Sequence, residues 1–217
     1  NSVIKKRLRG KNVNRYSCSW DGNWIIVIPS GWTNQMKGSS TAEDFMNANL
    51  PSLMGHLNTY KDRLLARDDK GDYWWELRPC SYYDEFDKEK VIWREIVNRP
   101  SFYYDNEHFY VEATGFIMTG DNLKYLCGVL NSKPCAFVFK RYYSGGGLGE
   151  EGYRYKKAFM MALPVPLVSD DNSATVRHIE EIVEKVTEMK KQNPDSDTST
   201  LEAEIDELVY ELYGLST

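Results

Sequence analysis

The sequence predicts an α+β protein, with a mixed, mostly antiparallel sheet body, flanking helices and a C-terminal antiparallel helical hairpin. Between residues 24 and 118, short apolar or aromatic runs of strand length are separated by turn residues. Residues 45–65 and 123–130 instead carry apolar side chains at helical spacing. After Pro166 two amphipathic segments are joined by a polar loop, which is typical of a helical hairpin. The 217 residues, 41% of them hydrophobic, suffice to bury a core.

The first part of the chain is expected to combine a strand, a loop and a helix. Residues 24–29 (WIIVIP) suit a buried strand that ends at a proline. Residues 31–40 are polar and rich in turn formers, so a loop is expected there. Leucines at helical spacing in residues 45–65 predict an amphipathic helix that starts near Pro51.

An aromatic block over residues 72–83 follows this helix and is too aromatic to be fully exposed. If the block is a strand, neighbouring side chains point to opposite sides. We therefore expect Trp74 or Trp75, but not both, to face outward.

Four short strands are predicted next, with Asp105-Asn106 as a hairpin turn; they cover residues 90–96, 102–104, 109–111 and 115–118. A helix capped by Thr119 or Asp121 is then expected over residues 123–130. Residues 136–139 suit either a buried strand or the end of a buried helix, since periodicity does not separate the two.

The C-terminal segment has a charge and a pattern of its own. Helices are predicted over residues 176–189 and 201–212, with Gly214 as the stop. From Asp170 onward there are 13 acidic and 4 basic residues, whereas residues 1–169 hold 23 basic and 19 acidic ones. We therefore predict a basic binding body at residues 1–169, and a helical hairpin at residues 170–217 that packs on the body or on neighbouring modules.

Cysteine and histidine spacing does not predict a metal site. The four cysteines include no Cys-x-x-Cys pair, and the three histidines stand apart. Without a signal peptide or a long apolar run, a cytoplasmic protein with free thiols and no membrane contact is expected. The chain begins with Asn1 rather than Met, so we expect a fragment of a longer protein.

Searches for catalytic patterns give no catalytic residues and no cofactor for this chain. Residues 147–152 match the letters of the Gly-x-Gly-x-x-Gly dinucleotide motif. Glu150 and Glu151 would place negative charge beside a pyrophosphate, and no βαβ unit follows, so this reading is disfavoured. A cofactor-using enzyme built on the glycine loop is kept as the weakest alternative.

Basic and aromatic residues gather in two places, at residues 4–16 and directly after the glycine loop, a combination that suits a polyanion with stackable bases. The candidates for phosphate contacts are Lys5, Lys6, Arg7, Arg9, Lys11, Arg15, Tyr153, Tyr155, Lys156 and Lys157. Arginine can pair with guanine, and asparagine or glutamine with adenine. The candidates for reading bases are Arg78, Arg99, Arg141, Arg154, Asn34 and Gln35; for each arginine, a salt bridge to a nearby carboxylate is the alternative.

Several blocks in order resemble the TaqI-like C-terminal specificity domain, the target recognition domain of adenine-N6 DNA methyltransferases and fused restriction–modification enzymes. The blocks are RGKNVNRY, DDKGDYWWELRPCSYYDEFDKEKVIWREI, NLKYLCGVLNSKPCAFVF, GYRYKKAFMMALPVP and LEAEIDELVYELYGL. The resemblance implies binding of double-stranded DNA beside a methyltransferase module of the same polypeptide, in a bacterial, type IIG-like parent enzyme.

In that family the methyltransferase module uses S-adenosylmethionine and an Asn-Pro-Pro-aromatic motif, and a fused nuclease would use Mg²⁺. The nearest string in this chain is Asn98-Arg99-Pro100-Ser101, which lacks the second proline and the ring. The resemblance therefore implies DNA reading without catalysis in this chain. The alternative is a protein–protein interaction module that uses the aromatic surface and the helical hairpin.

Overall fold

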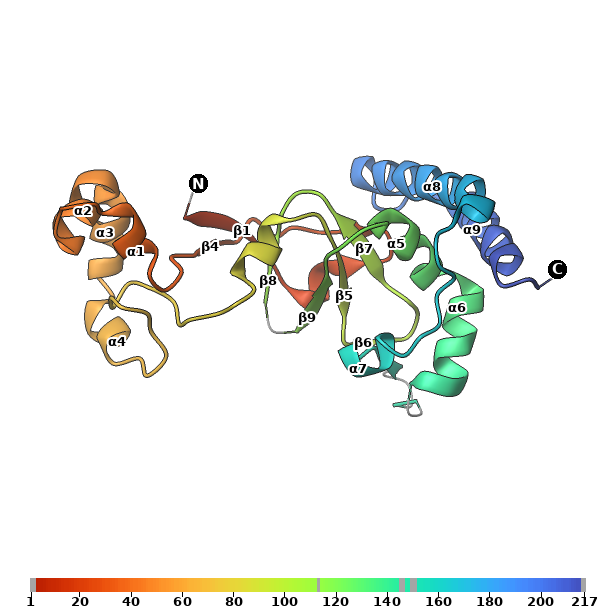
Figure 1. Cartoon of the computed structure of the whole chain (residues 1–217), viewed down its shortest axis with the longest axis horizontal. Coiled ribbons are helices and arrows are strands. Elements are labelled where there is room, and N and C mark those ends of the chain that lie inside the picture. The colour runs from red at the N-terminus through yellow and green to blue at the C-terminus, as the bar shows by residue number, and fades with distance from the viewer. Residues whose placement is uncertain (1–2, 113, 145–146, 149–151, 216–217) are drawn as a thin grey trace. The chain divides into compact units, whose positions relative to one another are not determined.

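The computed structural model describes residues 3–112, 114–144, 147–148 and 152–215 (Figure 1). Helices and mostly antiparallel strands occur together, which confirms the α+β class. The chain forms two compact units, and its path passes between them three times. Unit 1 consists of Asn1–Lys5 and Trp24–Glu85, and unit 2 of Lys6–Asn23 and Phe86–Thr217. The predicted division at residue 169 stays a prediction.

Unit 1 is mainly helical, and its helices differ from the predicted ones in two places. Residues 31–40, expected to be a loop, contain helix α1 (Trp32–Met36). Residues 45–65 form three short helices rather than one, namely α2 (Ala42–Asn49), α3 (Pro51–Asn58) and α4 (Lys61–Leu65). Leu50 takes a non-helical backbone conformation (φ −135°) and therefore separates α2 from α3. The predicted start at Pro51 is confirmed for α3, because proline is favoured at the first helical position.

The backbone around the two tryptophans of unit 1 is held by a buried carboxylate. Glu76 accepts hydrogen bonds from the backbone N–H groups of Gly31, Thr33 and Asp72, at 2.9–3.1 Å. The segment is a turn rather than a strand, so its side chains do not alternate between two faces. As a result Trp74 and Trp75 are both buried, and the expectation that one of them faces outward is wrong.

Unit 2 is built on a three-stranded antiparallel sheet in the order β7-β5-β9. β5 (Lys90–Arg94) is central and pairs with β7 (Phe102–Asp105) and β9 (Gly115–Met118). All of β7 and the first four residues of β5 are buried, as expected for strands covered on both faces. The three predicted strands are thus confirmed, with β5 ending two residues early.

Further strands pair outside this sheet. β1 (Ile4–Leu8) runs parallel to β8 (Tyr110–Val111), with Arg7 opposite Tyr110. The hairpin turn predicted at Asp105-Asn106 is therefore wrong, because β8 pairs with a distant strand and not with β7. The remaining pairs are β2 (Val13–Asn14) with β3 (Ser17–Cys18), and β6 (Ile96–Val97) with β10 (Tyr153–Arg154); β4 (Trp24–Ile26) lies in unit 1.

Helix α5 (Leu123–Asn131) covers the sheet at the predicted place. Its cap differs from the prediction: Asn122 in a left-handed conformation precedes it, without a capping side chain, instead of Thr119 or Asp121. Residues 136–139 are helical, within α6 (Lys133–Val138) and the π-helix that follows it (Phe139–Tyr143). α6 has Ser132 as its cap, and α7 (Lys157–Met160) follows β10. Single 3₁₀ turns occupy Gly10–Asn12, Tyr83–Asp87 and Asp170–Asn172.

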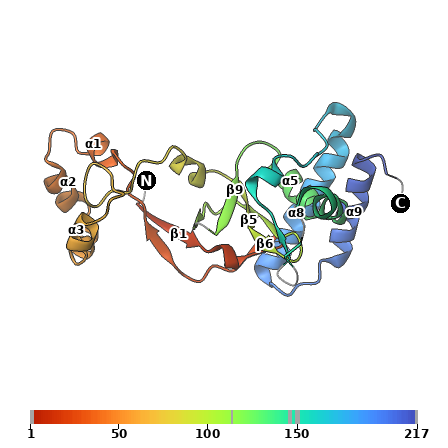
Figure 2. The same ribbon diagram turned by 90° about the horizontal axis from the view of Figure 1, so that it is seen from below.

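The C-terminal hairpin is confirmed as α8 (Ser173–Gln192) and α9 (Ser199–Leu212). Gly214 takes a left-handed conformation (φ +66°) after the second helix. α5 lies between the sheet and α8 (Figure 2). The apolar face of the hairpin is buried in this packing, since Ile179, Val183 and Val186 have no exposed surface.

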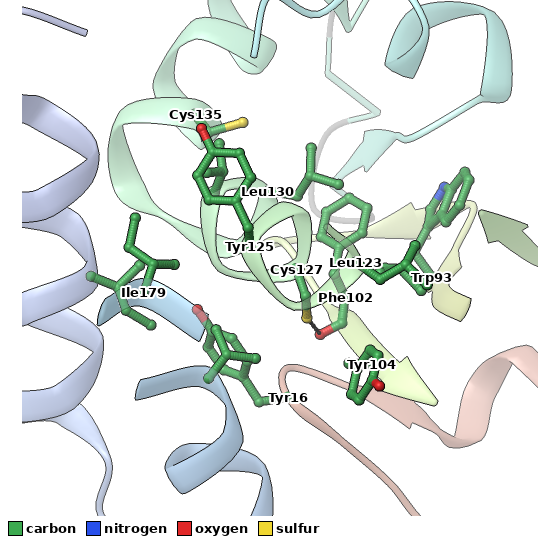
Figure 3. Close-up of a cluster of buried hydrophobic side chains, with 14 of the residues drawn as sticks. Tyr16, Trp93, Phe102, Tyr104, Leu123, Tyr125, Cys127, Leu130, Cys135 and Ile179 are labelled. Carbon is green, nitrogen blue, oxygen red and sulfur yellow. Dashed lines mark hydrogen bonds between the residues drawn. The ribbon is translucent and has the colours of Figure 1, made fainter. Parts of the chain in front are cut away.

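The core of unit 2 joins side chains from the sheet, α5 and α8. Phe102 of β7, Cys127 of α5, Ile179 of α8 and Tyr16, in the turn between β2 and β3, converge in Figure 3. Asn131 makes two hydrogen bonds to the backbone of Phe102, from its Nδ2 to the carbonyl at 2.8 Å and from the Phe102 N–H to its Oδ1 at 3.0 Å. This core holds in place the end of the sheet from which the chain continues into β6.

Candidate nucleic-acid interface

Two adjacent hollows lie in unit 2 beside β6. The first has a volume of about 310 Å³ and is lined by Asn14, Arg15, Arg94, Ile96, Val97, Asn98, Arg99 and Ser101. The second has a volume of about 360 Å³ and is lined by Gly10, Lys11, Arg94, Glu95, Ile96, Glu112 and Thr114. Arg94 and Ile96 belong to both. We call the polar residues Lys11, Asn14, Arg94, Asn98 and Arg99 the β6 face.

Three cations of the β6 face are not neutralised by any of the residues that the structure describes. Within the described part of the chain, the side chains of Lys11, Arg94 and Arg99 have no hydrogen-bond or ion-pair partner. Surface arginines and lysines without carboxylate partners attract anions such as phosphates. The β6 face can therefore bind a polyanion without first breaking a salt bridge.

The carboxylates near the β6 face already have partners. Glu95 accepts a hydrogen bond from Arg154 at 3.3 Å, and Glu112 accepts one from Arg7. Arg15 donates to Glu202 and to the carbonyl oxygen of Asn131, so its charge is also compensated. Among the described residues, the local balance of charge beside β6 is consequently positive.

Strand β10 extends this face through its antiparallel pairing with β6, in which Tyr153 lies opposite Val97. Gly152 precedes β10 with φ +104°, and a Cβ atom there would lie 2.3 Å from the carbonyl oxygen of Val97. Only glycine permits this close approach without displacement. Lys140 donates to the carbonyl oxygen of Asn98 at 3.2 Å and lies 4.9 Å above the ring of Tyr153.

The residues after β10 divide between core and surface. Tyr155 is buried and stacks on Phe139 with 4.1 Å between ring centroids, so its ring belongs to the core rather than to a phosphate contact surface. Lys156 and Lys157 are exposed at the start of α7. Arg141 is exposed as well. Of the predicted candidates after the glycine loop, Tyr153 and Arg154 are thus paired with β6, and Lys156 and Lys157 follow them in sequence on exposed surface.

The glycine loop itself is only partly described. Residues 145–146 and 149–151 lie outside the described residues, and so do Glu150 and Glu151 of the Gly-x-Gly-x-x-Gly string. Of the described loop residues, Leu148 donates its N–H to the carbonyl oxygen of Gly152 at 2.7 Å.

Most side chains of the predicted N-terminal basic strip have partners. Lys6 donates to Glu107 at 2.8 Å and Arg7 donates to Glu112, while Arg9 lies 3.9 Å from a carboxylate oxygen of Asp21. Lys5 is half-buried in the part of the strip that belongs to unit 1. The strip therefore does not form one continuous free surface, and Lys11 is its exposed member beside β6.

Three predicted base-reading candidates belong to unit 1. Arg78 is exposed and lies 3.6 Å from a carboxylate oxygen of Asp69. Asn34 donates to Asp72 and accepts a hydrogen bond from the Tyr73 hydroxyl, and Gln35 is exposed beside it on α1. The other three candidates, Arg99, Arg141 and Arg154, belong to unit 2.

A third hollow of about 400 Å³, between the sheet and α8, is lined by charges that are already paired. Lys124 pairs with Glu184 at 3.1 Å, and Lys191 pairs with Glu107 at 3.0 Å. Cys18, also in its lining, is partly buried, and this burial raises the pKa of its thiol to about 12. This hollow therefore offers neither a net charge nor a reactive thiolate.

The four cysteines are free thiols. Burial raises the pKa of Cys127 and of Cys135 to about 12, so both behave as small core residues. Within the described ranges, no group of three or more His, Cys, Asp or Glu side chains is arranged so that it could hold a metal ion. In the same residues no helix has the length and the apolar character needed to span a membrane.

Residues 5–165 match the model of a protein family described as the TaqI-like C-terminal specificity domain. The chain belongs to this family. Membership of this specificity-domain family confirms the resemblance seen in the sequence, and it indicates a role in DNA target recognition in restriction–modification enzymes. No curated protein matches the chain.

Three residues of the β6 face, Arg94, Asn14 and Asn98, were not among the candidates predicted from the sequence of this specificity domain. Arg94 ends a run of four buried residues, and an arginine at the exposed end of a buried strand is a usable signal. Asn14 and Asn98 have no such signal, because their proximity depends on the packing of the β2–β3 pair against β5.

Proposed function

We propose that this chain recognises a sequence in double-stranded DNA and holds the duplex for an adenine-N6 methyltransferase module of the same polypeptide. Family membership supports DNA target recognition. One observation supports placing the DNA on the β6 face: three of its cations have no partner within the described residues. In this proposal Lys11, Arg99, Lys156 and Lys157 bind phosphates and thereby position the duplex.

Chemistry belongs to other modules in this proposal. S-adenosylmethionine is the cofactor of the methyltransferase module, and Mg²⁺ that of a nuclease module if the parent is a type IIG restriction enzyme. The parent enzyme acts on DNA in a bacterial cytoplasm. This chain contributes the selection of the site at which methylation takes place.

The alternative, a protein–protein interaction module, is favoured by one observation. Phe137 on α6 and Tyr142 on the following π-helix are 67% and 71% exposed. The C-terminal hairpin gives this alternative little support, because Val183 and Val186 are buried and do not offer an apolar surface to a partner. An interaction of this kind would be apolar and therefore insensitive to salt.

A salt series of duplex binding, measured by fluorescence anisotropy with a randomised duplex, separates the two functions. Removing one cation that binds a phosphate reduces the slope of log affinity against log salt by about 0.9. We expect steep salt dependence for the wild type, and a slope smaller by about 2 for Lys156→Ala/Lys157→Ala.

The matched control is Arg177→Ala/Lys185→Ala, which removes two exposed cations from α8. It should leave the slope unchanged. Equal slopes in the wild type and in Lys156→Ala/Lys157→Ala would remove these lysines from the interface, and absence of binding at low salt would contradict the proposed function.

A further inference from the structure

Arg94 is the charged side chain that lines both hollows beside β6. It is the last residue of β5, half-buried after four buried residues. Its guanidinium has no partner within the described residues, although Glu95 and Glu112 are close by. These two carboxylates pair instead with Arg154 and Arg7. A positive group with five N–H donors is therefore kept free at the meeting point of the two hollows.

The backbone under Arg94 is fixed more firmly than that under the other free cations. β5 is the central strand of its sheet, and Arg94 lies opposite Gly115 of β9. Arg99 belongs to the connection between β6 and β7, and Lys11 to a single 3₁₀ turn. Side chains on strands hold a required geometry better than side chains on loops. Reading a base requires such a geometry, whereas a phosphate contact tolerates more freedom.

The order of the three cations also fits a groove of DNA. Lys11 lines only the second hollow and Arg99 only the first, with Arg94 common to both. Base edges lie in a groove between two phosphate backbones. A base-reading residue is therefore expected between two phosphate-binding residues, and Arg94 holds that place.

We propose that Arg94 determines part of the sequence specificity by reading a guanine. Its guanidinium would donate two hydrogen bonds, to O6 and N7 of the base, while Lys11 and Arg99 bind the flanking phosphates. No carboxylate lines the first hollow, as far as the residues described there show, so nothing competes with the base edge on that side. This inference rests on the proposed function.

Selection from a randomised duplex pool, followed by sequencing of the bound fraction, tests the role of Arg94. The variant is Arg94→Lys, which keeps the positive charge and loses the fork of parallel donors. We expect the wild type to enrich guanine at one position. In Arg94→Lys the preference for guanine at that position should fall about tenfold, while the preferences at other positions stay the same. The salt slope of Arg94→Lys should equal that of the wild type.

Arg99→Ala is the matched comparison, because it removes an exposed arginine from the same hollow. It should reduce the salt slope by about 1 and leave the enriched sequence unchanged. The thermal unfolding midpoint of each variant shows whether it is folded. If Arg94→Lys enriches the same guanine as the wild type, Arg94 does not read it.

The remaining outcomes separate this inference from the proposed function. Steep salt dependence without enrichment of any base by the wild type would overturn the reading role of Arg94 and leave the phosphate contacts standing. Absence of salt-dependent binding by the folded wild type would overturn both.

Discussion

Glu107 links β1 to the C-terminal hairpin. It accepts hydrogen bonds from Lys6 of β1 at 2.8 Å and from Lys191 of α8 at 3.0 Å. These two lysines lower the pKa of Glu107 below its ordinary value of 4.5. Because the pKa is lower in the folded state, the unfolded chain takes up the proton first as pH falls. The stabilisation is therefore complete above about pH 4.5 and is lost as pH falls through the folded-state pKa.

We expect Glu107→Gln to lower the free energy of unfolding by up to about 1 kcal/mol at neutral pH, since the ion pairs are partly exposed. The difference from the wild type should disappear in acid, where Glu107 is protonated in both states. Urea unfolding at a series of pH values measures it. Glu207→Gln, at an exposed position of α9, is the control and should show no such pH dependence. A constant difference at every pH would mean that Glu107 acts through packing alone.

The charged residues beside β6 show what sequence analysis could and could not find. Arg99, Lys156 and Lys157 were identified from local charge, and the structure places all three side chains on exposed surface. Arg7 and Arg15 looked equally available, yet their partners Glu112 and Glu202 lie more than one hundred residues away in sequence. Long-range pairing of this kind leaves no local pattern, so the sequence does not separate free from neutralised cations.

At the scale of elements, the contact between α5 and α8 depends on Gly128. A Cβ atom at this position would lie 2.6 Å from Cγ2 of Ile179 and 3.1 Å from Cγ2 of Val183. Overpacking a core contact costs about 1–3 kcal/mol. We expect Gly128→Ala to lower the free energy of unfolding by this amount, measured by urea unfolding.

Gly55→Ala is the control for Gly128→Ala. Gly55 lies within α3 with no atom near its missing Cβ, so alanine should stabilise the protein by about 0.4–1 kcal/mol. The cost at Gly128 should shrink in the presence of Ile179→Ala, which removes the opposing methyl group. If the two substitutions are strictly additive, the close contact is not the cause.

Elements whose pattern is local were predicted well, and elements that depend on tertiary packing were not. β5, β7, β9, α5, α8 and α9 all occur where periodicity indicated them. Residues 31–40 carry no helical pattern, and α1 forms there because Glu76, far along the chain, binds its first backbone N–H groups. β8 likewise depends on a parallel partner in β1. Such partners are fixed by the folded chain, and the local sequence does not contain them.

At the scale of the whole molecule, a net charge of −5 coexists with a positive β6 face. The acidic residues are concentrated from Asp170 onward, in and around α8 and α9. Repulsion between these carboxylates and phosphates keeps a polyanion away from the hairpin, while Lys11, Arg94 and Arg99 attract it. In the proposed function, this distribution of charge directs DNA to the β6 face, although the total charge of the chain is negative.

Photo-cross-linking tests most directly the claim that DNA binds to the β6 face. The duplex carries 5-iodouracil at several positions, and the cross-linked peptides of the wild-type chain are identified by mass spectrometry at low salt. If DNA lies on the β6 face, cross-links should form within residues 94–101 and 153–157 and should be reduced in Lys156→Ala/Lys157→Ala. Cross-links confined to Ser173–Gln192 and Ser199–Leu212 would contradict it, because DNA would then lie on the acidic hairpin.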